Sequence, residues 1–236
     1  MGTDGDLQPE LIAQTLERLR LRVSDRFATS GLLKICDRVL AVAKDAQKQI
    51  AWIERPNWVL RLLVIGLIAV AGAVLVSLVG AMELELDRLS LVDLANLIDA
   101  TLNEIVLIVA AIVFLVSIEV RVKRRKVVRC VNRLRCLAHI IDAHQLTKDP
   151  NIAPGGRGDT PHSPQRSLSD YELNRYLDYC SELLALLGKI GFLYVQHFHD
   201  PVAVESVNDL EVLTTGMARK IWQKIIILNA KAPLQA

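Results

Sequence analysis

The run Leu62–Met82 holds twenty-one consecutive residues without a charged side chain. A helix of that length rises about 31 Å, which is enough to cross the roughly 30 Å hydrocarbon core of a bilayer. The run therefore predicts a membrane-spanning helix. The chain is 52% hydrophobic but still 23% charged, a mixture that suits a small membrane part joined to a larger water-facing part.

A second apolar run, Ile105–Ile118, is shorter, with fourteen uncharged residues. As a helix it rises only about 21 Å, and including Val120 and Val122 brings it to about 27 Å. It crosses a bilayer only if Glu119 is tolerated near one membrane face. The alternative is a buried helix in a soluble protein. We favour a second span, because a single span leaves the charge patterns on either side unexplained.

Those charge patterns predict the orientation. Residues 83–104, between the two runs, carry six acidic residues and one basic residue, whereas residues 121–135 carry eight basic residues and no acidic one. Short loops rich in Lys and Arg stay in the cytosol. We therefore expect a multi-pass protein of the cell (inner) membrane with both termini cytoplasmic. Trp52 and Trp58 flank the inner start of the first span, where their rings suit the headgroup zone.

Two charged residues lie inside the predicted spans, Arg61 in the first and Glu119 in the second. The spans are antiparallel, so both residues sit near the cytosolic face at similar depth. Charges at that depth are costly unless they find a partner or reach the interface. We therefore predict an intramembrane ion pair between Arg61 and Glu119. The alternative is that each side chain reaches the headgroup zone separately.

Small residues recur at every fourth position of the first span, at Ala69, Ala73, Ser77 and Ala81. Small side chains let helix backbones approach closely, and such contacts drive helix association in lipid. This small-residue stripe therefore predicts packing against another helix. That helix belongs either to the same chain or to another subunit.

Outside the spans, apolar residues recur at helical spacing, which makes the fold class all-α. We expect a two-span transmembrane helical hairpin continuous with a cytosolic helical bundle. The predicted segments are an N-terminal cytosolic helix (1–30), a cytosolic stalk helix (31–56), transmembrane helix 1 (57–82), a short acidic external loop or helix (83–104), transmembrane helix 2 (105–122), a basic cytosolic stalk helix (123–146), a flexible linker (147–168) and a C-terminal cytosolic helical hairpin (169–230).

The C-terminal hairpin has recognisable helix starts. Ser169 with Glu172 forms a capping box, and Asp200 before Pro201 suits a cap followed by the first helical residue. Within the last helix, Trp222 either touches the membrane or anchors the helical core. We favour the core for Trp222.

The sequence contains no P-loop, GxGxxG, HExxH or GxSxG motif. We therefore expect no catalytic, cofactor-binding or metal site, and we interpret His197, His199 and Asp200 as a polar turn between helices. The basic run after the second span lies where anionic lipid headgroups bind, and nucleic acid is not expected as a partner. The predicted lipid contacts are Arg121, Lys123, Arg124, Arg125, Lys126 and Arg129.

These features together favour a non-enzymatic, self-associating two-span membrane protein. Its cytosolic helical bundle would act as a scaffold or adaptor that contacts other subunits or a cytosolic protein partner. An oligomeric pore or channel-like effector is the alternative, because a narrow or hydrophobically gated pathway needs few polar residues. A membrane-anchored enzyme is the third reading, but no catalytic constellation supports it.

Overall fold

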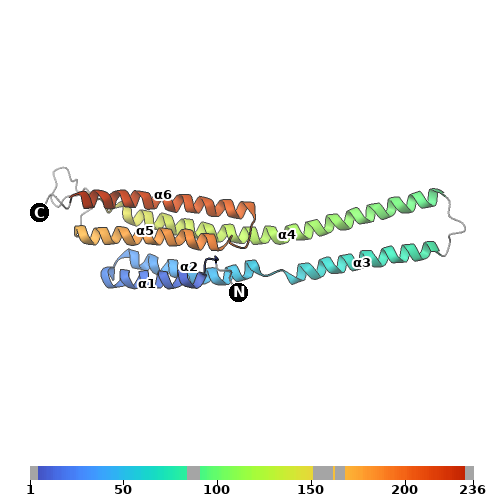
Figure 1. Cartoon of the computed structure of the whole chain (residues 1–236), viewed down its shortest axis with the longest axis horizontal. Coiled ribbons are helices and arrows are strands. Elements are labelled where there is room, and N and C mark those ends of the chain that lie inside the picture. Colours follow the sequence, from blue (N-terminus) through green and yellow to red (C-terminus); the bar gives the residue numbers. More distant parts are fainter. Residues whose placement is uncertain (1–4, 84–90, 151–161, 163–167, 232–236) are drawn as a thin grey trace. The chain divides into compact units, whose positions relative to one another are not determined.

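The computed structural model describes residues 5–83, 91–150, 162 and 168–231. All regular structure in these residues is α-helical (Figure 1). The helices are α1 (Pro9–Phe27), α2 (Gly31–Glu54), α3 (Trp58–Glu83), α4 (Leu91–Leu146), α5 (Asp170–Leu193) and α6 (Pro201–Lys231).

Helix α4 is a single helix of 56 residues. It covers residues that the sequence divides into an external segment, a second span and a basic stalk. From Leu91 onward, the short external loop or helix expected before the second span is part of this same helix.

The ends of the helices follow local chemistry. Helices α2 and α3 are separated at Pro56, because proline lacks an N–H and disfavours a helical residue before it. The predicted capping box is confirmed at the start of α5, where Ser169 N–H donates to Glu172 at 2.8 Å and Glu172 N–H donates to Ser169 Oγ at 3.3 Å. The predicted cap of α6 is confirmed as well, since Ala203 N–H donates to Asp200 at 3.0 Å.

The chain forms two compact units. Unit 1 contains Met1–Glu54 and Lys126–Ala236, and unit 2 contains Arg55–Arg125. Helix α4 contributes residues to both units, so each unit is described by itself below.

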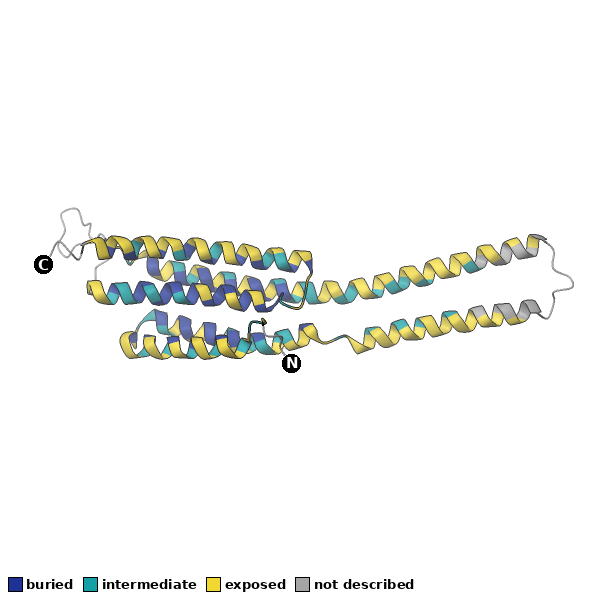
Figure 2. Cartoon of the chain, viewed as in Figure 1, coloured by how far each residue is buried: buried dark blue, intermediate teal, exposed yellow. Residues whose placement is uncertain are grey.

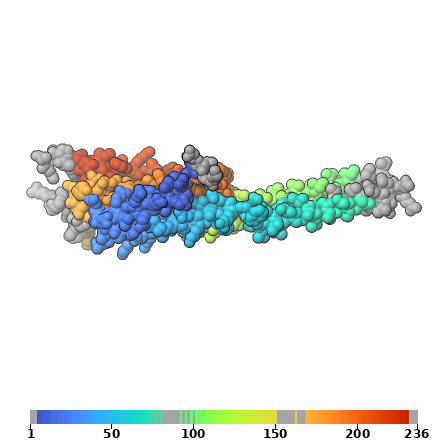
Figure 3. Space-filling model, turned by 60° about the horizontal axis from the view of Figure 1, so that its bottom comes forward, coloured from blue at the N-terminus to red at the C-terminus, as the bar shows by residue number. Residues whose placement is uncertain are grey.

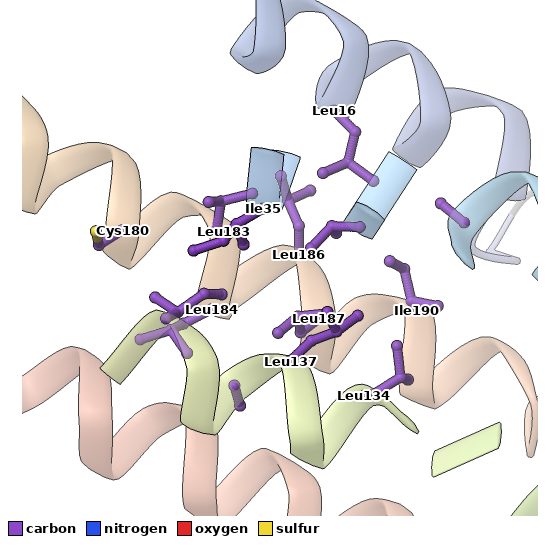
Figure 4. Close-up of a cluster of buried hydrophobic side chains, with 14 of the residues drawn as sticks. Leu16, Ile35, Leu134, Leu137, Cys180, Leu183, Leu184, Leu186, Leu187 and Ile190 are labelled. Carbon is purple, nitrogen blue, oxygen red and sulfur yellow. The ribbon is translucent and has the colours of Figure 1, made fainter. Parts of the chain in front are cut away.

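Unit 1 is built on one continuous apolar core to which α1, α2, α4, α5 and α6 all contribute. Figure 4 shows Leu16 of α1, Ile35 of α2 and Leu134 of α4 turned toward the leucines of α5. Helix α5 lies at the centre, and most of its apolar side chains are buried. Figure 3 shows α1 as the outer layer on one face of this unit.

Side-chain contacts fix how α4 runs within unit 1. His144 lies against Gly31 at the start of α2, and the Lys126 ammonium lies 4.0 Å from the Trp52 ring near the end of α2. Helices α2 and α4 are therefore antiparallel. In contrast, α4 and α6 are parallel, since Arg135 bonds to Asp209 at 2.8 Å and Gln145 O accepts from Lys224 at 2.9 Å.

The placement of Trp222 in the core is wrong, because its side chain is 52% exposed. The inward face of α6 is formed by Met217, Ile221, Ile225 and Leu228, which are all buried. A residue directly after Ile221 is turned about 100° away from that face by the helical twist. The position of Trp222 relative to the buried residues, rather than the size of its indole, determines that it is exposed.

Unit 2 consists of α3 and the first part of α4, and its apolar side chains are mostly exposed (Figure 2). Val70 in α3 is 63% exposed and Phe114 in α4 is 65% exposed. Both helices belong to stretches, Gly31–Val74 and Thr101–Leu146, that contain a segment long and apolar enough to cross a membrane. No residue of either segment is buried.

Candidate functional site

The main polar feature of unit 2 is a cluster at the break between α2 and α3. Asn57 N–H donates to Glu119 Oε1 at 3.3 Å, and Lys123 Nζ donates to Arg55 O at 3.0 Å. Glu119 and Lys123 also pair with each other at 2.8 Å. We call Arg55, Asn57, Glu119 and Lys123 the polar clasp.

The polar clasp resolves a backbone problem that Pro56 creates. A helix end leaves N–H or C=O groups without partners inside the helix. At the start of α3 a carboxylate accepts a free N–H, and at the end of the preceding segment an ammonium binds a free carbonyl. Both charges have the sign that the helix dipole favours at those ends. Glu119, the acid beside an apolar run, thus binds a backbone N–H at the start of α3, a contact that was not expected from the sequence.

Sequence reasoning missed the clasp, although two signals pointed to it. Glu119 and Lys123 are four residues apart, the spacing of a helical ion pair. Pro56 marks the helix break that exposes the backbone groups. Only the packing of α3 beside α4 joins these two signals, because they are more than sixty residues apart in the chain.

Arg61 lies close to the clasp but makes a different contact. Its guanidinium lies 5.7 Å from the centre of the Trp58 ring, a favourable cation–π arrangement. Arg61 and Glu119 line one hollow of about 360 Å³ between α3 and α4, together with Leu60, Val64, Ile65, Leu115 and Val116. Arg61 and Glu119 therefore lie near each other at this hollow. The ion pair that Glu119 forms in the structure is with Lys123. The Arg61–Glu119 pair stays a prediction.

The small-residue stripe of α3 faces away from α4. Ala69, Ala73 and Ser77 are exposed, whereas Leu67 and Ala71, on the other side of the helix, are half-buried. The side chain of Ala81, the fourth member, lies outside the described residues. The described part of the stripe is therefore open to contact from outside the chain.

The residues predicted to contact anionic lipid differ in their surroundings. Lys123 belongs to the polar clasp, and Lys126 stacks on Trp52. Arg121, Arg125 and Arg129 are exposed, and Arg124 is half-buried. Lipid contact stays a prediction for all six residues.

Buried thiols in unit 1 are poorly suited to nucleophilic chemistry. Burial raises the pKa of Cys36 to about 12, and burial likewise raises the pKa of Cys180. The reactive thiolate is therefore scarce at neutral pH in both side chains. Cys136 differs, because it is exposed.

In the polar turn between α5 and α6, Asp200 and His197 contact different partners. Asp200 accepts the Ala203 N–H as the cap of α6, at 3.0 Å. His197 instead lies 3.8 Å from Asp6 and 3.9 Å from Glu54, at a hollow of about 380 Å³. Within the part of the chain that the structure describes, no three His, Cys, Asp or Glu residues are arranged to hold a metal ion.

One polar contact inside unit 1 was not expected from the sequence. Lys224 Nζ donates to Gln145 O at 2.9 Å and to Gln145 Oε1 at 2.6 Å, at the C-terminal end of α4. Partial burial lowers the pKa of Lys224, since desolvation disfavours its charged form. The ammonium binds the backbone carbonyl and the side-chain amide oxygen of the same residue, so it helps to fix α6 beside α4.

Comparisons of this chain with protein-family models, with curated proteins and with solved structures give no match.

Proposed function

We propose that this protein is a non-enzymatic, two-span membrane protein that self-associates and uses its water-facing helical unit for contacts with other subunits or a protein partner. One observation carries the proposal. Most of the described apolar side chains of α3 and of the first part of α4 are exposed, over lengths that suit a bilayer.

A water-soluble monomer rarely exposes apolar patches of more than a few hundred Å². Side chains such as Val59, Ile65, Val76 and Val106 are therefore covered in the native state by lipid or by other helices. We favour lipid over other helices as the surroundings of these side chains, because the basic residues gather at one end of these segments and the acidic residues at the other. On this reading the segments form a transmembrane hairpin in the cell (inner) membrane, both termini are cytoplasmic, and unit 1 is a cytosolic helical bundle.

Self-association is supported by the small-residue stripe. Had Ala69, Ala73 and Ser77 packed against α4 of the same chain, they would be buried. They are exposed instead, so their close-packing surface is available to another subunit.

The pore alternative gains less support. Ser77 Oγ donates to Val74 O at 2.8 Å, and Ser117 Oγ donates to Val113 O at 2.7 Å. Both hydroxyls thus donate their hydrogen bond to a backbone carbonyl of their own helix. These two hydroxyls therefore offer no hydrogen-bond donor to a water-filled path, and we propose the scaffold function in preference to the pore.

Membrane topology is tested with the intact protein in native membranes. The protein should resist carbonate extraction and come free only with detergent. A protease added from the cytoplasmic side should remove tags at both ends. Extraction by carbonate, or tags that are cleaved from opposite sides, would refute the topology.

Self-association is tested by the mass of the protein in nanodiscs. The wild-type chain should be oligomeric, and the double variant Ala69→Leu, Ala73→Leu should shift toward monomer. Ile68→Phe adds bulk at an exposed position that lies at least 100° around the helix from Ala69, Ala73 and Ser77, and it should leave the mass unchanged. A wild-type protein that is strictly monomeric would overturn the scaffold function.

A further inference from the structure

We propose that neighbouring subunits bind through unit 1, with the N-terminal half of α6 of one copy seated in a groove between α2 and α4 of the next copy. This inference rests on the proposed self-association and specifies a water-exposed interface for it. It assigns a use to a basic groove and to an exposed face of α6 that carries Val202, Glu205 and Val212.

The groove is a shallow, open hollow of about 500 Å³ on the surface where α2 and α4 run side by side. Its floor is apolar, with Ala41, Val42 and Leu137. Three arginines surround that floor, Arg38, Arg129 and Arg133, and no acidic residue lines it. Such a groove fits a partner surface that combines apolar side chains with carboxylates.

The N-terminal half of α6 presents a surface of that kind. Val202 is 45% exposed and Val212 is 74% exposed. Glu205 lies between them in sequence and is exposed as well. Spacings of three and seven residues place these three side chains on neighbouring positions of one helix face. The face belongs to a helix that does not line the groove of its own chain.

The two surfaces lie at the same level of unit 1. Arg135 of α4 bonds to Ser206 O at 3.2 Å and to Asp209 at 2.8 Å, which aligns the two parallel helices. Counting back along both helices at 1.5 Å per residue puts Arg129 level with Val202, and Arg133 level with Glu205, within about one turn. Copies related by rotation about an axis along these helices keep their levels, so Glu205 of one copy meets the basic groove of the next without a shift along that axis.

The interface is heterologous, because each copy offers its α6 face to one neighbour and its α2–α4 groove to another. Such interfaces close into rings when the rotation between copies permits it. All copies then have the same orientation relative to a membrane, as a shared bilayer requires.

Cysteine cross-linking tests the contact directly in membranes. Cys136 lines the groove and is exposed, whereas Cys36, Cys130 and Cys180 are buried. In the variant Val212→Cys, a short bis-maleimide should link Cys136 of one subunit to position 212 of the next and give a ladder of bands. Gln223→Cys places the thiol about 16 Å farther along the same helix and should give no ladder. Equal linking of the two variants, or of neither, would overturn the interface.

Charge reversal in nanodiscs gives an independent test. Arg133→Glu and Glu205→Arg should each weaken assembly by about tenfold or more, and the double variant should recover most of it. Lys220→Glu, on the exposed C-terminal half of α6, is the matched control and should assemble as the wild type does. Circular dichroism checks that each variant keeps its helix content.

The outcomes separate this inference from the broader proposal. Oligomeric wild type with unaffected Arg133→Glu and Glu205→Arg variants would overturn the α6 interface and leave self-association standing. A monomeric wild type would overturn both. If Arg133→Glu keeps the wild-type mass but loses co-purifying phosphatidylglycerol, the groove binds lipid and the inference is wrong.

Discussion

Unit 1 and unit 2 use the same apolar residue types in opposite ways. In unit 1, Leu187 and Ile190 of α5 are fully buried, and charged residues such as Lys189 point outward beside them. In unit 2, Leu62 and Ile65 of α3 are exposed, and no charged residue follows them as far as Met82. Figure 2 shows the difference as buried helix faces in unit 1 and largely exposed helices in unit 2.

The difference teaches that apolar content alone does not make a core. A helix with one apolar stripe buries that stripe against its neighbours and leaves its polar side in water. A helix that is apolar on every side has no face for water, so its surroundings must be apolar too. The two units are therefore built for two solvents, and each prediction below probes that contrast.

The largest contrast is expected from removing leucine side chains. Leu187→Ala opens a cavity in the core of unit 1 and should cost about 2–5 kcal/mol of unfolding free energy. Leu62→Ala removes an exposed side chain of unit 2 and should change stability by less than about 0.5 kcal/mol. Denaturant unfolding of the full chain in nanodiscs measures both. Equal costs would mean that Leu62 is covered by protein.

An arginine scan separates exposure to lipid from exposure to water. Ile68 in α3 is 51% exposed and Ile226 in α6 is 63% exposed. If lipid surrounds Ile68, Ile68→Arg should weaken membrane insertion by about 2–3 kcal/mol, whereas Ile226→Arg should leave insertion unchanged. The carbonate-resistant fraction after synthesis with membranes reports both variants. Normal insertion of the Ile68→Arg chain would contradict a lipid-facing α3.

Glycine substitutions compare how tightly the two units are packed. A Cβ at Gly191 of α5 would lie 2.6 Å from Leu210 Cδ2, whereas one at Gly72 of α3 would have no atom within 4 Å. Leu210 is buried and has little room to move, so Gly191→Ala should cost about 1–3 kcal/mol. Gly72→Ala should be neutral or slightly stabilising, because alanine favours helix more than glycine does. Thermal unfolding of the two variants gives the comparison, and a destabilised Gly72→Ala would indicate a close contact at α3.

The smallest effect is expected at the water-exposed start of α5. Hydrogen bonds from Ser169 lower the pKa of Glu172 below its usual range. A group with a lowered folded-state pKa adds stability above its unfolded pKa, and that stability is lost as the pH falls through the folded value. The stability of unit 1 should thus decrease slightly below about pH 4. The Glu172→Gln variant keeps an amide for the capping box and should lack this component of the acid response.

The sequence determined which segments are helical and where several of them begin. Proline at 56 broke the helix, and Ser169 with Glu172 started another, because these effects act through a few neighbouring residues. The sequence also determined that two stretches are apolar on all sides, since that property needs only composition and length.

Tertiary structure decided everything that depends on which face meets which neighbour. It assigned Glu119 to the free backbone groups beside Pro56, turned Trp222 outward, and left the small-residue stripe of α3 exposed. It also placed Glu205 of α6 level with a basic groove between α2 and α4. A sequence specifies the spacing of side chains along one helix, but the angle and level of a second helix arise only from the packing of the whole core.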